Sequence, residues 1–293
     1  MARMGTIAAR AESLLGAAVV ATTPVAGGDI CTATRLRLSD GRSALVKTRP
    51  HAPPDFFEVE AHGLRWLAEA GGVHVPDVLA VSDDCLILSW VEPGRPGTDA
   101  AESFARELAR THAAGAEHFG ADRDGYIGLA PLTNAAADSW PEFWVTRRVL
   151  PYVKVARDKG RIDGDSGTTI ERLADSIDKF AGPEEPPSRL HGDLWSGNIV
   201  WSADGSGWVV DPAAYAGHRE TDLAMLALFG APHLSRLIEA YDEAAPLADG
   251  WRDRVPLHQI HPLLVHAILF GGSYGARAGA AARSVLTGTS GAS

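Results

Sequence analysis

The sequence predicts an α+β protein with two lobes, a smaller one built on an antiparallel sheet and a larger one that is mainly helical. In the first third of the chain, short alternating apolar and polar segments are separated by glycine turns, which is typical of antiparallel strands. The rest of the chain carries apolar residues at helical spacing. A proline- and glycine-rich stretch at residues 92–97 separates the two patterns. We therefore expect an N-terminal lobe at residues 1–93 and a C-terminal lobe at residues 94–293.

The N-terminal lobe is expected to combine strands with one short and one longer helix. Residues 33–38 alternate, with Leu36 and Leu38 on one face, and a Ser-Asp-Gly turn leads to a return strand at residues 43–48. The other predictions are a helix at residues 7–15, a turn at residues 24–29, a helix at residues 56–69, an extended segment at residues 73–81 and a strand at residues 85–91.

The C-terminal lobe is predicted to be a set of helices, some of which have a clear cap. Ser139 and Glu142 form a capping box with proline in the first turn, so a helix should follow them. Thr168 is expected to open another helix. His112 falls at helical spacing and is expected to be a hydrogen-bonded core histidine. Further helices are predicted at residues 100–115, 220–229, 234–242 and 256–270.

Composition describes an ordinary globular protein and excludes several classes. Of the 293 residues, 45% are hydrophobic and 22% are charged, and the net charge of −10 argues against a nucleic-acid-binding surface. Cys31 and Cys85 are too few for a disulfide framework, so a reducing cytoplasm fits. We expect neither a signal peptide nor a membrane span, because no apolar stretch has the required length.

Residues 190–213 contain the pattern around which the chain is organised. Asp193 and Asn198 stand five residues apart, which is the spacing of a kinase catalytic loop, H-x-D-x-x-x-x-N. Two short apolar strands follow, and this hairpin should bring Asp211 back beside Asn198. Trp201 and Trp208 are expected to face each other across the hairpin in the core.

These residue types suit the transfer of a phosphoryl group. Asp193 can orient an acceptor hydroxyl and take its proton, whereas Asn198 and Asp211 supply the hard oxygen ligands that Mg²⁺ prefers. The alternative is a structural hairpin in which His191 and Asp193 only cap the loop. The catalytic interpretation is favoured because three polar roles occur in the order that the mechanism requires.

Lys47 and Glu60 are predicted to form an ion pair. On the helix at residues 56–69, Glu60 falls in the middle of the apolar face, where a carboxylate is costly unless it is paired. Lys47, on the strand before this helix, is the natural partner, and such a pair positions the lysine on the α- and β-phosphates in kinases. The alternative is a solvated lysine and a glutamate paired with an arginine elsewhere. The loop at Asp193 favours the functional interpretation.

Two further segments are predicted to contact a nucleotide. Gly27 and Gly28 precede the strand pair that ends in Lys47, where glycine backbone can approach phosphates. Backbone groups from Ser89 to Val91, through Trp90, can bind a nucleobase at the junction between the lobes. That assignment comes from the architecture, because backbone contacts leave no side-chain pattern.

Trp195 lies inside the catalytic loop and has two interpretations. It can pack against the protein, or it can form a flat wall against which a sugar rests. Its position between Asp193 and Asn198 slightly favours the second.

With these motifs in place, the chain resembles the fructosamine kinase (ketosamine kinase) family. This family lies within the aminoglycoside-phosphotransferase and choline-kinase branch of the protein-kinase-like fold. Many small-molecule kinases share only His-Gly-Asp, Asn and Asp. The Leu-Trp-Ser-Gly insertion in the loop, the Gly-His-Arg-Glu segment and the Phe-Gly-Gly-Ser-Tyr segment together are much more specific to this family, and the matching segments cover most of the chain. They are Gly27-Gly28-Asp-Ile, Leu45-Val-Lys47, Phe57-Glu-Val-Glu60, Gly125-Tyr-Ile-Gly128, Trp140-Pro-Glu-Phe-Trp144, Leu190-His-Gly-Asp-Leu-Trp-Ser-Gly-Asn198, Gly217-His-Arg-Glu-Thr-Asp-Leu-Ala-Met225 and Phe270-Gly-Gly-Ser-Tyr274.

The resemblance implies a bilobal protein-kinase-like fold and ATP-dependent phosphorylation of ketoamines, the Amadori sugars on amines and protein lysines, at the sugar 3-hydroxyl. Asp193 would be the base, Asn198 and Asp211 the Mg²⁺ ligands, and Lys47 and Glu60 the ATP-binding pair. The candidates for the sugar side are Trp195, His218, Glu220 and Tyr274.

Two other points come from the same comparison. Asp222 is expected to be structural and to brace the catalytic loop. Eukaryotic relatives often carry a cysteine where this chain has Asp29, and Cys31 is displaced by two positions, so their thiol switch is not carried over.

Two other functions stay open at this point. One is a phosphotransferase for an aminoglycoside, choline or a similar alcohol, because the acceptor cannot be computed from a motif. The other is a nucleotide-binding protein without catalysis, against which the intact set of polar residues argues. The sequence leaves open the sugar, its amine carrier and the oligomeric state.

Overall fold

The N-terminal lobe is a twisted antiparallel sheet with a helix on each face. A computed structural model describes residues 2–26 and 30–288, with side chains from residue 7 onward. The strand order is β1-β2-β3-β5-β4. The elements are α1 (Ala2–Leu15), β1 (Val19–Val25), β2 (Thr32–Leu38), β3 (Ser43–Thr48), α2 (Phe56–Ala68), β4 (Val78–Ser82) and β5 (Cys85–Ser89).

Strand alternation gives this sheet two apolar faces. Leu36 and Val46 pack with residues of α1, whereas Leu86 and Leu88 pack with the apolar side of α2. Successive side chains of a strand point to opposite faces, so Lys47, next to Val46, points to the side of α2. This places the Lys47 side chain next to the helix that carries Glu60.

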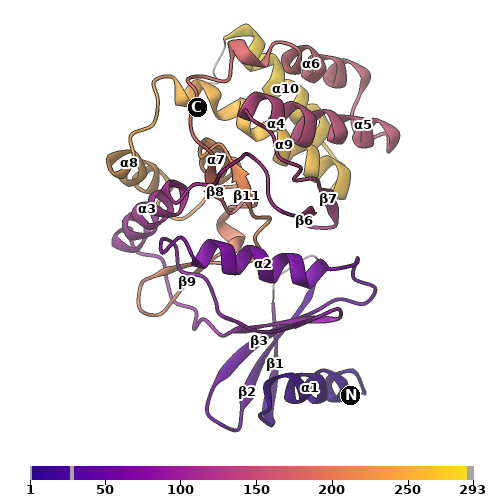
Figure 1. Cartoon of the computed structure of the whole chain (residues 1–293), viewed down its shortest axis with the longest axis vertical. Helices are drawn as coiled ribbons and strands as arrows, with labels where there is room; N and C mark the ends of the chain where they lie inside the picture. Colours follow the sequence, from indigo (N-terminus) through magenta and orange to yellow (C-terminus); the bar gives the residue numbers. More distant parts are fainter. Residues whose placement is uncertain (1, 27–29, 289–293) are drawn as a thin grey trace.

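The C-terminal lobe is mainly helical, with short two-stranded sheets beside α2 (Figure 1). Its largest core forms where α9 packs with α5 and α10, and where α6 packs with α10. The helices are α3 (Thr98–Ala113), α4 (Trp140–Phe143), the π-helix η1 (Trp144–Val149), α5 (Leu150–Asp158), α6 (Gly164–Ala174), α7 (Glu220–Phe229), α8 (Leu234–Ala244), α9 (Trp251–Phe270) and α10 (Tyr274–Thr287), with single 3₁₀ turns η2 (Ile177–Lys179) and η3 (Ser196–Asn198). The strands pair as β6 (Gly125–Ile127) with β7 (Ala130–Leu132), β8 (Ser188–Leu190) with β11 (Tyr215–Gly217), and β9 (Ile199–Trp201) with β10 (Gly207–Val209).

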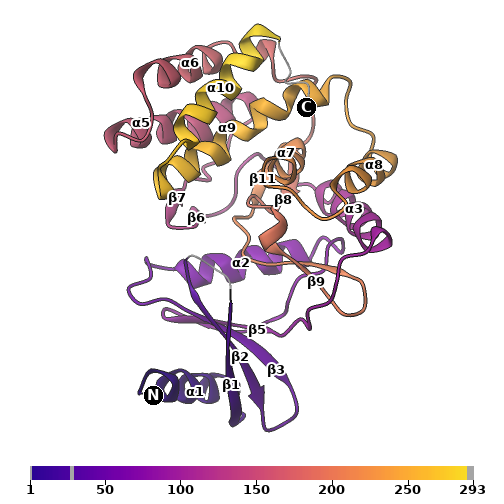
Figure 2. The same ribbon diagram turned by 180° about the vertical axis from the view of Figure 1, so that it is seen from behind.

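Helix α2 lies between the sheet and the C-terminal lobe, as both views show (Figures 1 and 2). The chain passes from one lobe to the other through residues 90–97, and this linker runs beside the β9–β10 hairpin. The N–H of Gly94 donates to the carbonyl of Trp201 at 2.6 Å, and the N–H of Ala203 donates to the carbonyl of Glu92 at 2.9 Å. The two-lobe fold class is confirmed, while the boundary between residues 93 and 94 stays a prediction. Within the described ranges, no helix is long and apolar enough to cross a membrane.

Most predicted elements are present, and the prediction contains four errors, two of which are missed elements. Strand β1 was missed, and it includes residues 24–25 of the predicted turn. Helix α6 begins at Gly164, because Asp163 rather than a later threonine caps it, accepting the N–H of Ser166. Helix α10 was not predicted, because its many alanine and glycine residues give a weak apolar stripe.

The fourth error is the pairing of the two tryptophans in the β9–β10 hairpin. Trp208 pairs with Val200 and Trp201 with Gly207, so the two indoles lie on opposite faces. Trp201 packs against Phe104 in the core, as expected, whereas Trp208 is half-buried and stacks on His74.

Candidate active site

The catalytic loop is fixed by a buried carboxylate from α7. Strand β8 leads into the loop, and Asp222 Oδ2 accepts the N–H of His191 at 2.8 Å while its Oδ1 accepts the N–H of Gly192 at 3.0 Å. The His112 ring lies 3.3 Å from the same carboxylate and is bonded to Tyr241. The predicted bracing role of Asp222 and the core role of His112 are both confirmed.

Asp193 and Asn198 face each other inside this loop. The side-chain amide nitrogen of Asn198 donates to the Asp193 carbonyl at 2.8 Å and to its carboxylate at 3.1 Å. This orientation leaves the amide oxygen of Asn198 as the atom that can bind a cation. Burial raises the pKa of Asp193 to about 7, although the bond from Asn198 opposes the change.

The hairpin returns Asp211 to the same place. The N–H of Val210 donates to the Asn198 carbonyl at 3.0 Å, and a His191 ring nitrogen lies 2.8 Å from the Val210 carbonyl. Asp211 itself has a φ of 56°, a left-handed conformation that is uncommon for residues other than glycine, although asparagine and aspartate adopt it more often than most. Such strained backbone is often found at functional sites, and here it turns the Asp211 side chain toward the N-terminal lobe.

Lys47 joins the two halves of the site. Its Nζ lies 2.6 Å from Glu60 Oε1 and 2.8 Å from Asp211 Oδ1. Lys47 and Glu60 are buried, whereas the Asp211 side chain is 43% exposed. Burial acts to lower the pKa of Lys47, but the two carboxylates outweigh it and raise that pKa, so the ammonium stays charged. The predicted ion pair is therefore present, with Asp211 as an additional partner.

The segment predicted to bind a nucleobase is already partly hydrogen-bonded. The N–H of Ser89 donates to the Asp77 carbonyl at 2.9 Å, and the N–H of Trp90 donates to the Ser43 carbonyl at 3.3 Å. Among these three predicted residues, Val91 has the backbone N–H for which the structure shows no bond in its described ranges. Gly27 and Gly28 lie outside the described residues.

An aromatic group extends from the catalytic loop to the start of α10. The half-exposed Trp195 ring meets Phe229 edge-on at 6.3 Å, His266 lies 4.5 Å from Phe229, and Tyr274 lies 5.1 Å from His266. A side chain at Gly197 would overlap the Trp195 ring, so the glycine allows this position. The structure thus brings two predicted sugar-side residues, Trp195 and Tyr274, into one group.

Sequence reasoning missed Phe229 and His266 as members of this group. Phe229 is the last residue of α7, and His266 lies in the last turn and a half of α9. Their position near helix ends was available, but only the packing of α7 on α9 shows that they meet.

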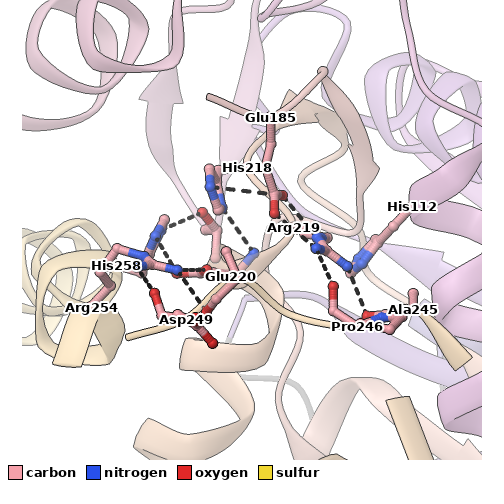
Figure 3. Close-up of polar contacts among 12 residues, drawn as sticks. His112, Glu185, His218, Arg219, Glu220, Ala245, Pro246, Asp249, Arg254 and His258 are labelled. Atoms are coloured by element: carbon pink, nitrogen blue, oxygen red, sulfur yellow. Dashed lines mark hydrogen bonds and ion pairs between the residues drawn. The ribbon is translucent and has the colours of Figure 1, made fainter. Parts of the chain in front are cut away.

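The other two sugar-side candidates lie in a buried polar cluster (Figure 3). Arg254 donates two hydrogen bonds to Glu220, at 2.6 and 2.9 Å, and His258 approaches the same carboxylate at 3.3 Å. Glu220 and His218 are each only 3% exposed. Because Arg254 holds both oxygens of Glu220, the structure gives this carboxylate a protein partner, and substrate contact by His218 and Glu220 stays a prediction.

Electrostatics favour an ion-pair network here. Burial opposes the ionisation of Glu220, but His258 and Arg254 outweigh it and lower its pKa to about 2. Burial, assisted by His258, lowers the pKa of His218 to about 3, so this histidine is neutral at pH 7. Ligand atoms of His218, Glu220 and His258 lie within 4.8 Å of one another, a spacing that also suits a metal ion, but the Arg254 cation occupies that carboxylate.

The family model for fructosamine kinases matches residues 4–287, nearly the whole chain. This chain belongs to the fructosamine kinase family. Two curated relatives are a probable ketoamine kinase from Enterococcus faecium, 33% identical over 87% of this chain and 91% of its own, and one from Thermus thermophilus, 36% identical over 86% and 88%. The chain is therefore a kinase, an enzyme that transfers a phosphoryl group.

Solved structures agree with the fold. A candidate fructosamine-3-kinase from Thermobifida fusca superposes with a TM-score of 0.91 and 46% identity, covering 96% of this chain and 99% of that one. A choline kinase from Streptococcus pneumoniae, 12% identical with coverage of 98% and 100%, superposes with a TM-score of 0.64. The second likeness shows the fold alone, which is protein-kinase-like, as the resemblance implied.

Proposed function

We propose that this kinase uses ATP to phosphorylate the 3-hydroxyl of sugar ketoamines, such as fructosamine and ribulosamine adducts on amines or protein lysines. This reaction would be a first step of deglycation. One observation carries the proposal: Asp193, the predicted base, and Trp195, the start of an aromatic surface, stand two residues apart in one braced loop. A base and a flat apolar wall at this spacing suit a sugar hydroxyl presented in line with a phosphate.

The nucleotide would bind between the lobes. Lys47, held by Glu60, would contact the α- and β-phosphates, and its raised pKa supports a full positive charge there. The backbone of residues 89–91 would bind the nucleobase, chiefly through Val91, because the N–H groups of Ser89 and Trp90 already donate to carbonyls within the lobe.

Mg²⁺ fits the oxygen atoms that this site offers. Asp211 has a half-exposed carboxylate with one oxygen on Lys47, and the amide oxygen of Asn198 is turned away from Asp193. Hard oxygen donors of this kind match the ligands of Mg²⁺, so Asn198 and Asp211 would hold it. When bound, the ion would neutralise charge on the phosphate oxygens.

Asp193 would orient the acceptor hydroxyl and accept its proton. A general base works best when its pKa lies near the working pH, and burial places the Asp193 pKa at about 7. The bond from Asn198 would keep one carboxylate oxygen fixed while the other faces the substrate.

The sugar would rest against Trp195, with Tyr274 at the other end of the aromatic group. His218 and Glu220 would act on the sugar from the buried cluster. We also propose a cytoplasmic location, which suits ATP and two free cysteines. Burial raises the pKa of Cys31 to about 11, so its thiol is protonated at neutral pH and suits no thiolate switch.

The test is ATP turnover with a panel of acceptors: a ribulosamine, a fructosamine, an aminoglycoside and choline. The proposal expects turnover only with ketoamines, and a product phosphorylated at carbon 3 of the sugar by NMR. Turnover with the aminoglycoside or choline alone would contradict it. An Asp193→Asn variant serves as the inactive control.

A further inference from the structure

One face of α2 is committed to the C-terminal lobe. Phe56 lies 5.6 Å from the Tyr126 ring, a side chain at Gly125 would press on Val59, and a side chain at Gly63 would meet Ala214 at 3.1 Å. The three α2 positions 56, 59 and 63, continued by 66, have the spacing of a single helical stripe. The C-terminal lobe, which carries the catalytic loop, therefore packs against α2 along most of its length.

Arg189 closes this stripe at the C-terminal end of α2. Its guanidinium donates to the carbonyl of Trp66 at 2.7 Å and to the carbonyl of Gly115 at 3.0 Å. It also lies over the Trp66 ring, 4.9 Å from the centroid. Trp66 is in the last turn of α2, and Gly115 follows the end of α3, so one side chain caps two helices from different lobes.

The chemistry suits arginine in particular. The last carbonyls of a helix lack intrahelical donors and carry the negative end of the helix dipole, so a cation there is favourable. A planar guanidinium can serve two carbonyls at once and stack on an indole, which an ammonium cannot do with the same geometry. Glu69 contributes little, because its oxygen is 3.8 Å away and its side chain is 69% exposed.

Arg189 is also connected to the catalytic loop through the chain itself. It lies on β8, two residues before His191, and α2 carries Glu60 less than two turns before Trp66. A shift of α2 away from β8 would move Glu60 and release Lys47. In protein kinases the position of the corresponding helix decides whether the lysine is in place.

We propose that Arg189 is a positioning residue: it fastens α2 to β8, the strand that leads into the catalytic loop. In this way it holds Glu60 and Lys47 in the arrangement that binds the nucleotide before any ligand is present. This inference rests on the proposed use of ATP, but not on the identity of the acceptor. Under it, the catalytic pair is assembled by a contact built into the fold.

The test compares Arg189→Met with Arg189→Lys and with a matched control, Arg236→Met. Arg236 bonds Glu102 and Glu243, so it joins α3 and α8 within the C-terminal lobe alone. The readouts are hydrogen exchange of peptides from α2, the affinity for ATP with Mg²⁺ by calorimetry, and the melting temperature. None of these readouts requires an acceptor, so they test the role of Arg189 even if the proposed sugar substrate proves wrong.

For Arg189→Met we expect faster exchange in α2 but not in β2 and β3. We also expect about 5- to 20-fold weaker ATP binding, because Lys47 would no longer be held in place for its charge-assisted contact with the phosphates. Arg189→Lys should recover part of the affinity, because a point charge can reach one carbonyl. Arg236→Met should leave ATP binding unchanged. The inference would be overturned if Arg189→Met bound ATP as the wild type does, or if exchange rose equally in all segments, which would mean a general loss of stability.

Discussion

The ammonium of Lys47 lies 2.8 Å from the carboxylate of Asp211, although the two residues are 164 positions apart in the chain. Lys47 is the point at which both lobes meet, because its other partner, Glu60, belongs to the N-terminal lobe. The site is thus held together by one buried cation and two carboxylates.

This arrangement predicts unequal costs for removing its members. Lys47→Met leaves the buried Glu60 without a counter-ion and should lower the free energy of unfolding by about 3–5 kcal/mol. Glu60→Gln leaves Lys47 with Asp211 and should cost about 1–3 kcal/mol. Urea unfolding at pH 7 measures both. Equal losses would mean that Asp211 does not share the charge of Lys47.

Asp193 should be needed for chemistry and not for nucleotide binding. Asp193→Asn keeps the size of the side chain but removes the base, so we expect turnover to fall about 10²–10⁴-fold while ATP affinity stays within about twofold. Steady-state kinetics with a ketoamine acceptor and ATP titration by calorimetry check the two parts. Near-normal turnover would remove Asp193 from this role.

Asp222 should affect turnover without touching a ligand. Asp222→Ala leaves the N–H groups of His191 and Gly192 buried without an acceptor, each at a cost of about 1–3 kcal/mol. Asp222→Asn keeps one acceptor oxygen and should be milder. We expect a lower kcat in both variants with little change in KM for ATP, and a larger loss of melting temperature for alanine. A normal kcat in the alanine variant would show that the loop holds its shape unaided.

Part of this site was predictable because its physical reasons are local. Glu60 on an apolar helix face required a nearby cation, and Lys47 was the neighbouring strand residue. The spacing of Asp193 and Asn198 is set within a single loop. The bracing role of Asp222, on the helix that follows, was expected from the resemblance to the family rather than from a local pattern.

The remainder depends on contacts that only the folded chain creates. Arg254 holds Glu220 from 34 residues away, so a residue predicted for the sugar side also belongs to an ion-pair network. Phe229 and His266 meet because α7 packs on α9. A shift of one residue in the pairing of β9 with β10 moves a side chain to the other face of the hairpin, and the sequence did not determine this register. In the structure Trp208 pairs with Val200, so its ring lies on the face away from Trp201 and stacks on His74.

Trp195 should affect the binding of the sugar and not the binding of the nucleotide. Its ring is half-exposed and meets only Phe229 among the described rings, so Trp195→Ala removes a surface with little loss of core packing. We expect KM for a ketoamine to rise about tenfold, as for loss of one aromatic stacking contact, with KM for ATP unchanged. Trp195→Phe should retain part of the effect. If both KM values rose together, the ring would be acting on the loop and not on the sugar.

Acid should destabilise the protein partly through His218. Its pKa is about 3 in the folded protein against an ordinary value of 6.5, so below pH 6.5 the unfolded chain binds a proton that the folded chain rejects. The stabilisation is complete above pH 6.5 and is lost as the pH falls toward 3, by up to about 1.4 kcal/mol per pH unit. Between pH 7 and pH 5 this group alone contributes about 2 kcal/mol, whereas Glu220, with a pKa of about 2, does not yet titrate.

The measurement is urea unfolding of the wild type and of His218→Asn at pH 7 and pH 5. The variant should be less stable at pH 7 but lose about 2 kcal/mol less on acidification, because one proton fewer is taken up on unfolding. His118→Asn is the control for the loss of a histidine, since the His118 side chain is 55% exposed and lies beside Glu117, outside the Glu220 cluster. An unchanged pH dependence in His218→Asn would mean that His218 takes up a proton in the folded protein at its ordinary pKa, and the Arg254–Glu220 network would then have to accommodate another buried charge at pH 5.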